Sequence, residues 1–210
     1  TDLEQAKLYQ RSVLTGNDRV MTGDSLFYNK LTGDLFAYSN IDYNDRLNKN
    51  ILRGNYVWYN ELSGEALCYD KALTMDYSSG PDTLYLHADT IRMTTFYLNT
   101  DSVQRQVDAY FHVRAYRKDV QAVCDSLTFD SKLRRLTMYR DPIVWSDNRQ
   151  ILGEQIDVNF NEQTIDSIYV SRQALIVEQV DSLHFNQVSG HLMRAYFKNG
   201  DMHENYVDGN

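Results

Sequence analysis

Two short segments carry the residue types that hydrolytic chemistry uses. Ser25 stands in the tetrapeptide Gly23-Asp24-Ser25-Leu26, and Asp181 and His184 are separated by two residues later in the sequence. A serine hydroxyl becomes a nucleophile when an imidazole accepts its proton and a carboxylate holds that imidazole in place. Ser25, His184 and Asp181 are therefore the candidate nucleophile, general base and orienting acid.

The tetrapeptide and the Asp-x-x-His spacing resemble the signatures of the GDSL esterases. Those enzymes have long amphipathic helices, which this sequence does not predict, and a nucleophile elbow needs a strand that leads into a helix. Ser25 is expected inside a strand. The pattern Asp-(Ser/Thr)-apolar also recurs as a strand-entry motif, starting at Asp24, Asp82, Asp89, Asp101, Asp125, Asp166 and Asp181. We predict that the protein is not an enzyme, and the esterase is the least favoured hypothesis.

Metal and cofactor chemistry has weaker signals. Histidines 87, 112, 184, 191 and 203 show no helical i, i+4 pairing and no Cys-x-x-Cys companion. Acidic residues cluster at expected turns, where a Ca²⁺ site stays open as an alternative. We predict no metal and no cofactor. The two cysteines, Cys68 and Cys124, form no disulfide framework and do not decide the compartment.

Apolar residues two positions apart predict strands with one buried face. Strands are expected at 23–28, 35–43, 54–59, 66–77, 108–116, 136–145, 165–170 and 174–180, and a short helix is expected only at 3–10. We predict that the apolar pairs line one interior stripe. Its candidate lipid-binding residues are Leu26, Tyr28, Val57, Tyr59, Ile91, Met93, Leu127, Phe129, Ile156 and Val158.

The strands belong to an internal repeat. Residues 28–34 match residues 59–65 at an offset of 31, and an Asn and a Gly in each predict a hairpin turn. Degenerate copies start near 23, 54, 88, 124, 153 and 190. Such units must stack to bury their apolar faces. We therefore expect one all-β domain over 1–210, an elongated open jelly roll or β-solenoid-like sandwich, which forms part of a longer chain because Tyr206 to Asn210 interrupts a unit.

Composition excludes one class of partner. The net charge of -8 and the pI near 5.0 do not fit a nucleic-acid-binding protein, which needs clustered Lys and Arg. No run approaches the ~18 consecutive apolar residues of a membrane span. The 16 tyrosines suit half-buried sheets, where a ring packs while its hydroxyl reaches water.

The repeated Gly-x-x-apolar-x-Tyr-Asn strand, the Thr/Ser-Gly turn and the Leu-x-Gly-Asn segments 14–17 and 52–55 together resemble the LptA/OstA-like family of lipopolysaccharide-transport proteins. The resemblance spans residues 14–210, although the repeat length varies and segment 141–145 departs from the pattern. It implies an open β-jelly roll whose slot shields the acyl chains of lipopolysaccharide in the periplasm, on the way to the outer membrane. It also implies head-to-tail strand pairing with itself or with homologous jelly rolls.

Two hypotheses about the interior stripe stay open. In a lipid carrier or bridge segment the interior is open along one side, whereas in a structural repeat scaffold the same residues form a dry core and exposed edges bind protein. The sequence pattern is the same in both.

Overall fold

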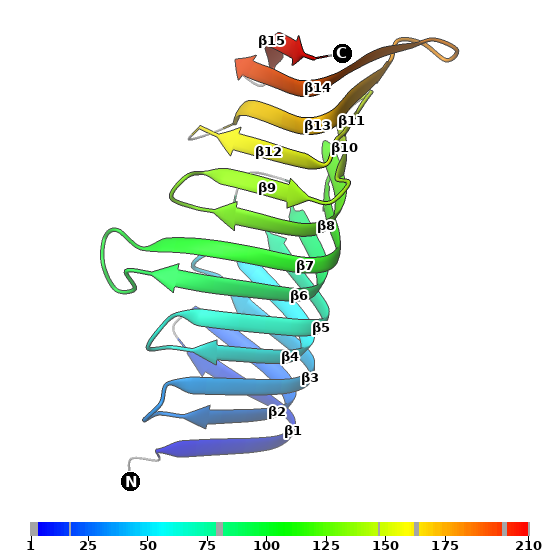
Figure 1. Ribbon diagram of the computed structural model, residues 1–210. Coiled ribbons are helices and arrows are strands. Elements are labelled where there is room, and N and C mark those ends of the chain that lie inside the picture. The colour runs from blue at the N-terminus through cyan, green and yellow to red at the C-terminus, as the bar shows by residue number, and fades with distance from the viewer. Residues whose placement is uncertain are drawn as a thin grey trace. The chain divides into compact units, whose positions relative to one another are not determined.

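The computed structural model describes residues 4–16, 18–78, 82–146, 148–161, 164–198 and 201–209. These residues form fifteen β-strands and no helix (Figure 1), which confirms the all-β prediction. The chain divides into two compact units, Thr1–Phe111 and His112–Asn210. We describe each unit by itself.

Unit 1 is an antiparallel sheet in which each strand pairs with the next one in the chain. Its strands are β1 (Gln5–Gly16), β2 (Arg19–Asn29), β3 (Asp34–Asp45), β4 (Asn50–Asn60), β5 (Glu65–Asp76) and β6 (Leu84–Phe96), and β7 (Gln104–Arg117) crosses the boundary between the units. Period-two patterning and short polar turns therefore translate directly into consecutive hairpins.

The helix predicted at 3–10 is wrong. Within it, β1 begins at Gln5, where Ala6 pairs with Tyr28 and Leu8 pairs with Leu26. Local helix propensity is a weak preference, and pairing with β2 satisfies the backbone groups and places Leu8 against a buried neighbour. Residues 2, 3, 17 and 210, which also carried sequence predictions, lie outside the described residues.

The predicted turn chemistry is confirmed at both copies of the repeat. The side-chain oxygen of Asn29 accepts a hydrogen bond from the backbone N–H of Leu31 at 3.0 Å, and Asn60 does the same with Leu62 at 3.0 Å. Gly33 has a φ of 73°, and a Cβ there would lie 2.7 Å from Cγ of Leu62. Glycine is therefore required both by the backbone and by the leucine of the next turn.

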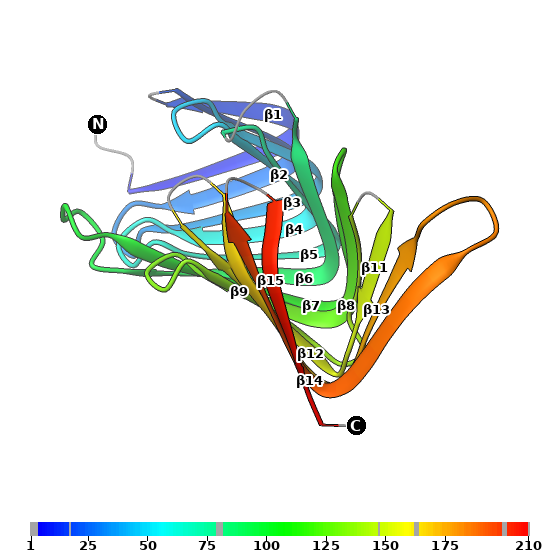
Figure 2. The same ribbon diagram turned by 90° about the horizontal axis from the view of Figure 1, so that it is seen from above.

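The strands of unit 1 bend sharply near their middles (Figure 2). In β3 the bend is made by Ser39 and Asn40, with φ values of 58° and 51°, and the pairing register shifts there. On the neighbouring strand, a Cβ at Gly54 would lie 2.5 Å from Sγ of Cys68. Each bend divides the sheet into two arms. We call the arm that contains Met21 the first arm and the arm that contains Leu26 the second arm.

Unit 2 repeats the arrangement with interrupted strands. It contains β8 (Val120–Asp130), β9 (Arg135–Tyr139), β10 (Ile143–Ser146), β11 (Arg149–Leu152), β12 (Gln155–Phe160), β13 (Ile165–Gln179), β14 (Phe185–Lys198) and β15 (Asp201–Asp208). The first half of β8 pairs with β10 and its second half pairs with β9. In the same way, the first half of β13 pairs with β12 and its second half pairs with β11. β9 with β10, and β11 with β12, therefore each correspond to one bent strand.

Two strand boundaries in unit 2 differ from the prediction. The run 136–145 is two strands, because Arg140 and Asp141 have positive φ and Pro142 has no N–H to donate. The runs 165–170 and 174–180 are one strand, β13, which bends at Arg172 and Gln173 and ends at Gln179. Side-chain periodicity does not reveal whether a bend interrupts the backbone pairing.

Candidate functional site

A row of apolar side chains runs across the second arm of unit 1 on the inner face of the bend. Leu26, Val57 and Ile91 are only 2%, 1% and 5% exposed. The smaller residues Ala37 and Cys68 alternate with these larger ones. Each strand contributes one member to the row. We call this row the first ladder, and its successive register partners are Leu8, Leu26, Ala37, Val57, Cys68 and Ile91.

Unit 2 has its own first ladder. Leu127 and Ile156 are 3% and 0% exposed, and both pair with Met138. The row consists of Leu127, Met138, Ile156, Val170, Met193 and Val207. Val207, on β15, is 40% exposed. The first ladders are thus packed core in the absence of any guest, and their contact with lipid stays a prediction.

A second ladder lies two residues from the first ladder on each strand, on the side away from the bend. In unit 1 all of its members are half-buried: Ala6, Tyr28, Leu35, Tyr59, Ala66 and Met93. In unit 2 its successive members are Phe129, Leu136, Val158, Ile168 and Ala195. Of these, Val158, Ile168 and Ala195 are only 8%, 7% and 4% exposed. The sequence predicted the position of this ladder but not its different exposure in the two units.

The first arm differs between the units as well. In unit 1 its inner row contains Met21, Tyr43, Leu52, Thr74 and Leu86, of which only Met21 is buried. In unit 2 the corresponding row contains Ala122, Val144, Ile151, Ile176 and Val188. Val144, Ile151 and Ile176 are 7%, 5% and 8% exposed. The inner face of unit 1 is therefore more polar and more accessible than that of unit 2.

A polar cluster stands on this inner face in unit 1. Arg19 Nε donates to Asp45 Oδ2 at 3.0 Å, and the hydroxyl of Tyr43 donates to the same oxygen at 3.3 Å. Burial opposes ionisation of Asp45, but hydrogen bonds from Asn48 and the charge of Arg19 together lower its pKa. Burial, reinforced by the charge of Asp45, raises the pKa of Tyr43 to about 12.

The second ladder reaches this cluster. Tyr59, on the second arm, acts electrostatically on both Arg19 and Tyr43, on the first arm. Such influence requires proximity, so the two arms approach each other at Tyr59. Sequence analysis missed the cluster, because the only signal was a pair of opposite charges, Arg19 and Asp45, on facing strands.

Of the candidate hydrolytic residues, Asp181 and His184 are in direct contact, with Nδ1 of His184 2.8 Å from Oδ2 of Asp181. Ser25 lies inside β2, as predicted, and pairs with Tyr9 and Tyr38 in unit 1. In unit 2, Asp181 accepts hydrogen bonds from the backbone N–H groups of Leu183 and His184, which lower its pKa together with the nearby imidazole of His184. Asp181 therefore stabilises a turn.

The cysteines are free and buried. Burial raises the pKa of the Cys68 thiol to about 12, and burial together with the charge of Asp125 raises that of Cys124 to about 12. Both thiols therefore act as small core side chains. Within the described ranges, no group of three or more His, Cys, Asp or Glu side chains is placed to hold a metal ion.

No protein family model matches the chain, and no curated protein matches its sequence significantly. In the part of the chain that the structure describes, no helix is long and apolar enough to cross a membrane.

Proposed function

We propose that this protein is a non-enzymatic lipid carrier or bridge segment whose acyl-contact surface is the second ladder of unit 1. The observation that supports this proposal is the half-buried apolar and aromatic row on the inner face of the bend, above a first ladder that is already packed. An acyl chain on this row would remain outside the core and would cover side chains that water reaches in the free protein.

The energy of such contact is favourable. Each methylene removed from water contributes about 0.8 kcal/mol. The row consists of six register partners on six neighbouring strands. Its length is therefore several times the spacing between strands, which is about 4.8 Å. Partial burial against this surface therefore suits reversible binding of one or more acyl chains, as a carrier requires.

The family resemblance supplies the rest of the proposal. It suggests that the bent sheet is an open β-jelly roll, that the lipid is lipopolysaccharide and that the protein acts in the periplasm. It also suggests partners of the same architecture, or a second copy, joined by edge strands. An edge strand has unpaired backbone N–H and C=O groups that can pair with another strand.

A structural scaffold is the second candidate, and unit 2 favours it. Val158 and Ile168 are buried in the same row that is open in unit 1. An interior of this kind is a dry core, and binding would then take place at edges and outer faces.

Lipid that co-purifies with the protein, analysed by mass spectrometry, distinguishes the two candidates. Ala66→Glu places a carboxylate in the second ladder between the register partners Tyr59 and Met93. The control Leu67→Glu places the same group on the opposite face, beside Arg92. We expect fatty acyl lipid with the unsubstituted protein and with Leu67→Glu, and its loss with Ala66→Glu. Folded protein without any bound lipid would favour the scaffold.

A further inference from the structure

A tyrosine precedes the bend of successive odd-numbered strands. The residue that follows it always has a positive φ. Because successive side chains of a strand alternate between the two faces, each tyrosine points away from the face of the apolar residue that precedes it. These tyrosines are 38% to 73% exposed, and they are Tyr9, Tyr38, Tyr69, Tyr110 and Tyr139. A core role does not explain aromatic rings that recur at exposed corners.

In unit 1 two of these rings belong to an aromatic column. The ring of Tyr38 meets Tyr56 edge-on with centroids 5.3 Å apart, and Tyr56 stacks on Tyr69 at 4.3 Å with an interplanar angle of 21°. The next register partner of Tyr69 is Thr90, which has no ring to continue the column. The column therefore ends at Tyr69.

A cavity of about 520 Å³ begins where the column ends. Its lining includes Tyr69, Asp70, Lys71, His87, Asp89 and Thr90. It is an open surface hollow rather than an enclosed cavity, so a ligand there would keep one side in solvent. One aromatic wall is thus surrounded by carboxylate, ammonium, imidazole and hydroxyl groups.

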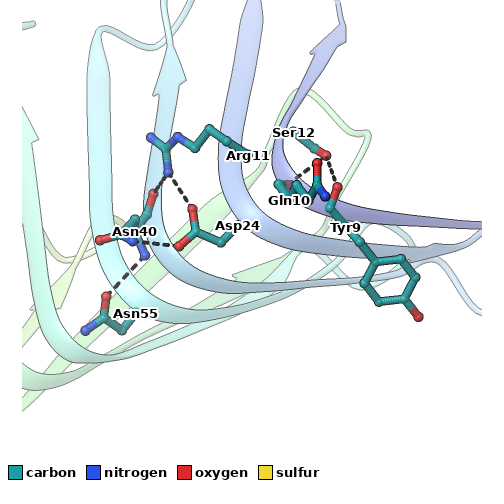
Figure 3. Close-up of polar contacts among 7 residues, drawn as sticks. All are labelled: Tyr9, Gln10, Arg11, Ser12, Asp24, Asn40 and Asn55. Carbon is teal, nitrogen blue, oxygen red and sulfur yellow. Dashed lines mark hydrogen bonds and ion pairs between the residues drawn. The ribbon is translucent and has the colours of Figure 1, made fainter.

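The polar side of the cavity is positioned by a chain of hydrogen bonds along the corner. Asn55 Nδ2 donates to Asp70 Oδ2 at 3.1 Å, and Asn55 Oδ1 accepts from the backbone N–H of Asn40 at 3.2 Å. Asn40 Nδ2 donates to Asp24 at 2.6 Å, and Arg11 contacts Asp24 at 3.4 Å (Figure 3). Asp70 is therefore held at one end of an ordered row.

We propose that this corner of unit 1 is a carbohydrate-binding site for a neutral pyranose of an oligosaccharide. The electron-rich face of Tyr69 suits the C–H groups on one face of a sugar ring. The carboxylates of Asp70 and Asp89 accept hydrogen bonds from hydroxyls, and Lys71 donates to them. The net charge of -8 disfavours an anionic ligand. This inference does not depend on lipid binding, which concerns the inner face.

His87 adds a second polar group at the site. Its Nδ1 is buried and has no hydrogen-bond partner among the residues that the structure describes. A buried nitrogen of this kind is costly unless it is satisfied. A sugar hydroxyl that reaches His87 would supply the missing partner.

Titration with cellotetraose and chitotetraose, followed by NMR of the isotope-labelled protein, tests the site. We expect saturable shifts at Tyr69, Asp70 and Thr90 with at least one of the two sugars. Tyr69→Ala removes the ring against which the sugar would pack and should weaken binding about three- to tenfold. In Thr90→Tyr a further ring would extend the aromatic column over the exposed face of Tyr69. This change should weaken binding as strongly as Tyr69→Ala.

Tyr38→Ala is the matched control, because it removes an exposed corner tyrosine that does not line the cavity. It should change the affinity by less than about twofold, on the scale where tenfold corresponds to 1.4 kcal/mol. Each variant is compared by its unfolding curve to show that the fold is retained. Absence of saturable shifts with both sugars, or binding by Tyr69→Ala and Thr90→Tyr as tight as that of the unsubstituted protein, would overturn the proposal.

Discussion

The second ladder is half-open in unit 1 and largely closed in unit 2, although both units build it from the same strand positions. Tyr59 and Met93 are half-buried, whereas Val158 and Ile168 are 8% and 7% exposed. The same alternating pattern therefore produces two kinds of interior. Register determines which residues share a row, but it does not determine whether that row is accessible.

The first arms of the two units differ in the same direction. Unit 1 places a charged and phenolic cluster, Arg19, Tyr43 and Asp45, on the inner face. Unit 2 places Val144 and Ile151 there, both buried. Apolar side chains pack against each other and exclude water, while a charged group retains contact with solvent or pairs with a partner. We therefore assign the proposed lipid contact to unit 1.

The largest effect is expected in the ladder that both units close. Ile156→Ala removes a side chain that is 0% exposed and should lower the free energy of unfolding by about 2 to 5 kcal/mol. Val57→Ala should act in the same direction in unit 1. Urea denaturation measures both. Leu133→Ala, at a turn residue that is 54% exposed, is the control and should change stability by less than about 0.5 kcal/mol.

Alkaline pH should weaken both units through groups whose pKa is raised by burial. The pKa values of Tyr43, Cys68 and Cys124 are about 12 in the folded protein, above their values in the unfolded chain. The folded state keeps these protons when the unfolded state loses them. Stability is therefore complete below about pH 8.5 and falls as the pH rises toward 12. Denaturation midpoints measured across this range should decrease.

One substitution and one chemical reagent separate the contributions of the phenol and the thiols to this decrease. Tyr43→Phe should reduce the part that arises in unit 1 above about pH 10, and a thiol reagent should modify Cys68 and Cys124 only as the protein unfolds. Rapid modification of either thiol in the native protein would contradict the burial assigned to it.

A moderate effect should separate the two second ladders. Ile168→Ala, in the closed row of unit 2, should cost about 2 kcal/mol or more. Leu35→Ala, in the half-open row of unit 1, should cost about 1 kcal/mol, because less of its surface leaves water on folding. Chemical denaturation of the two variants gives this difference. Equal losses would remove the distinction between the units.

The smallest effects are expected at ion pairs. Arg172 and Glu154 in unit 2 are 3.2 Å apart with side chains 70% and 39% exposed, so Arg172→Ala should change stability by about 0.5 kcal/mol or less. Arg19 in unit 1 pairs with Asp45, whose side chain is 6% exposed. Arg19→Ala should therefore cost more than Arg172→Ala in the same assay, because it leaves a buried carboxylate without its cation.

The sequence predicts the parts of this molecule that depend on short-range pattern. The repeat offset of 31 placed Leu26 and Val57 in one row, and Asn with Gly marked the turns. The corners were missed because Ser39 and Asn40 adopt positive φ without a glycine, under the constraint of pairing on both sides. The cluster of Arg19 and Asp45 was missed because the predicted strands, 23–28 and 35–43, stop short of these two register partners.

Site-specific photocrosslinking tests the central claim most directly. A photoreactive amino acid placed at Met93, in the open ladder of unit 1, should capture fatty acyl lipid in cells that produce the protein. The same amino acid at Val158, the corresponding ladder of unit 2, and at Arg92, on the outer face of unit 1, should capture little. Absence of lipid at position 93, or equal capture at all three positions, would contradict the assignment of the acyl-contact surface to the second ladder of unit 1.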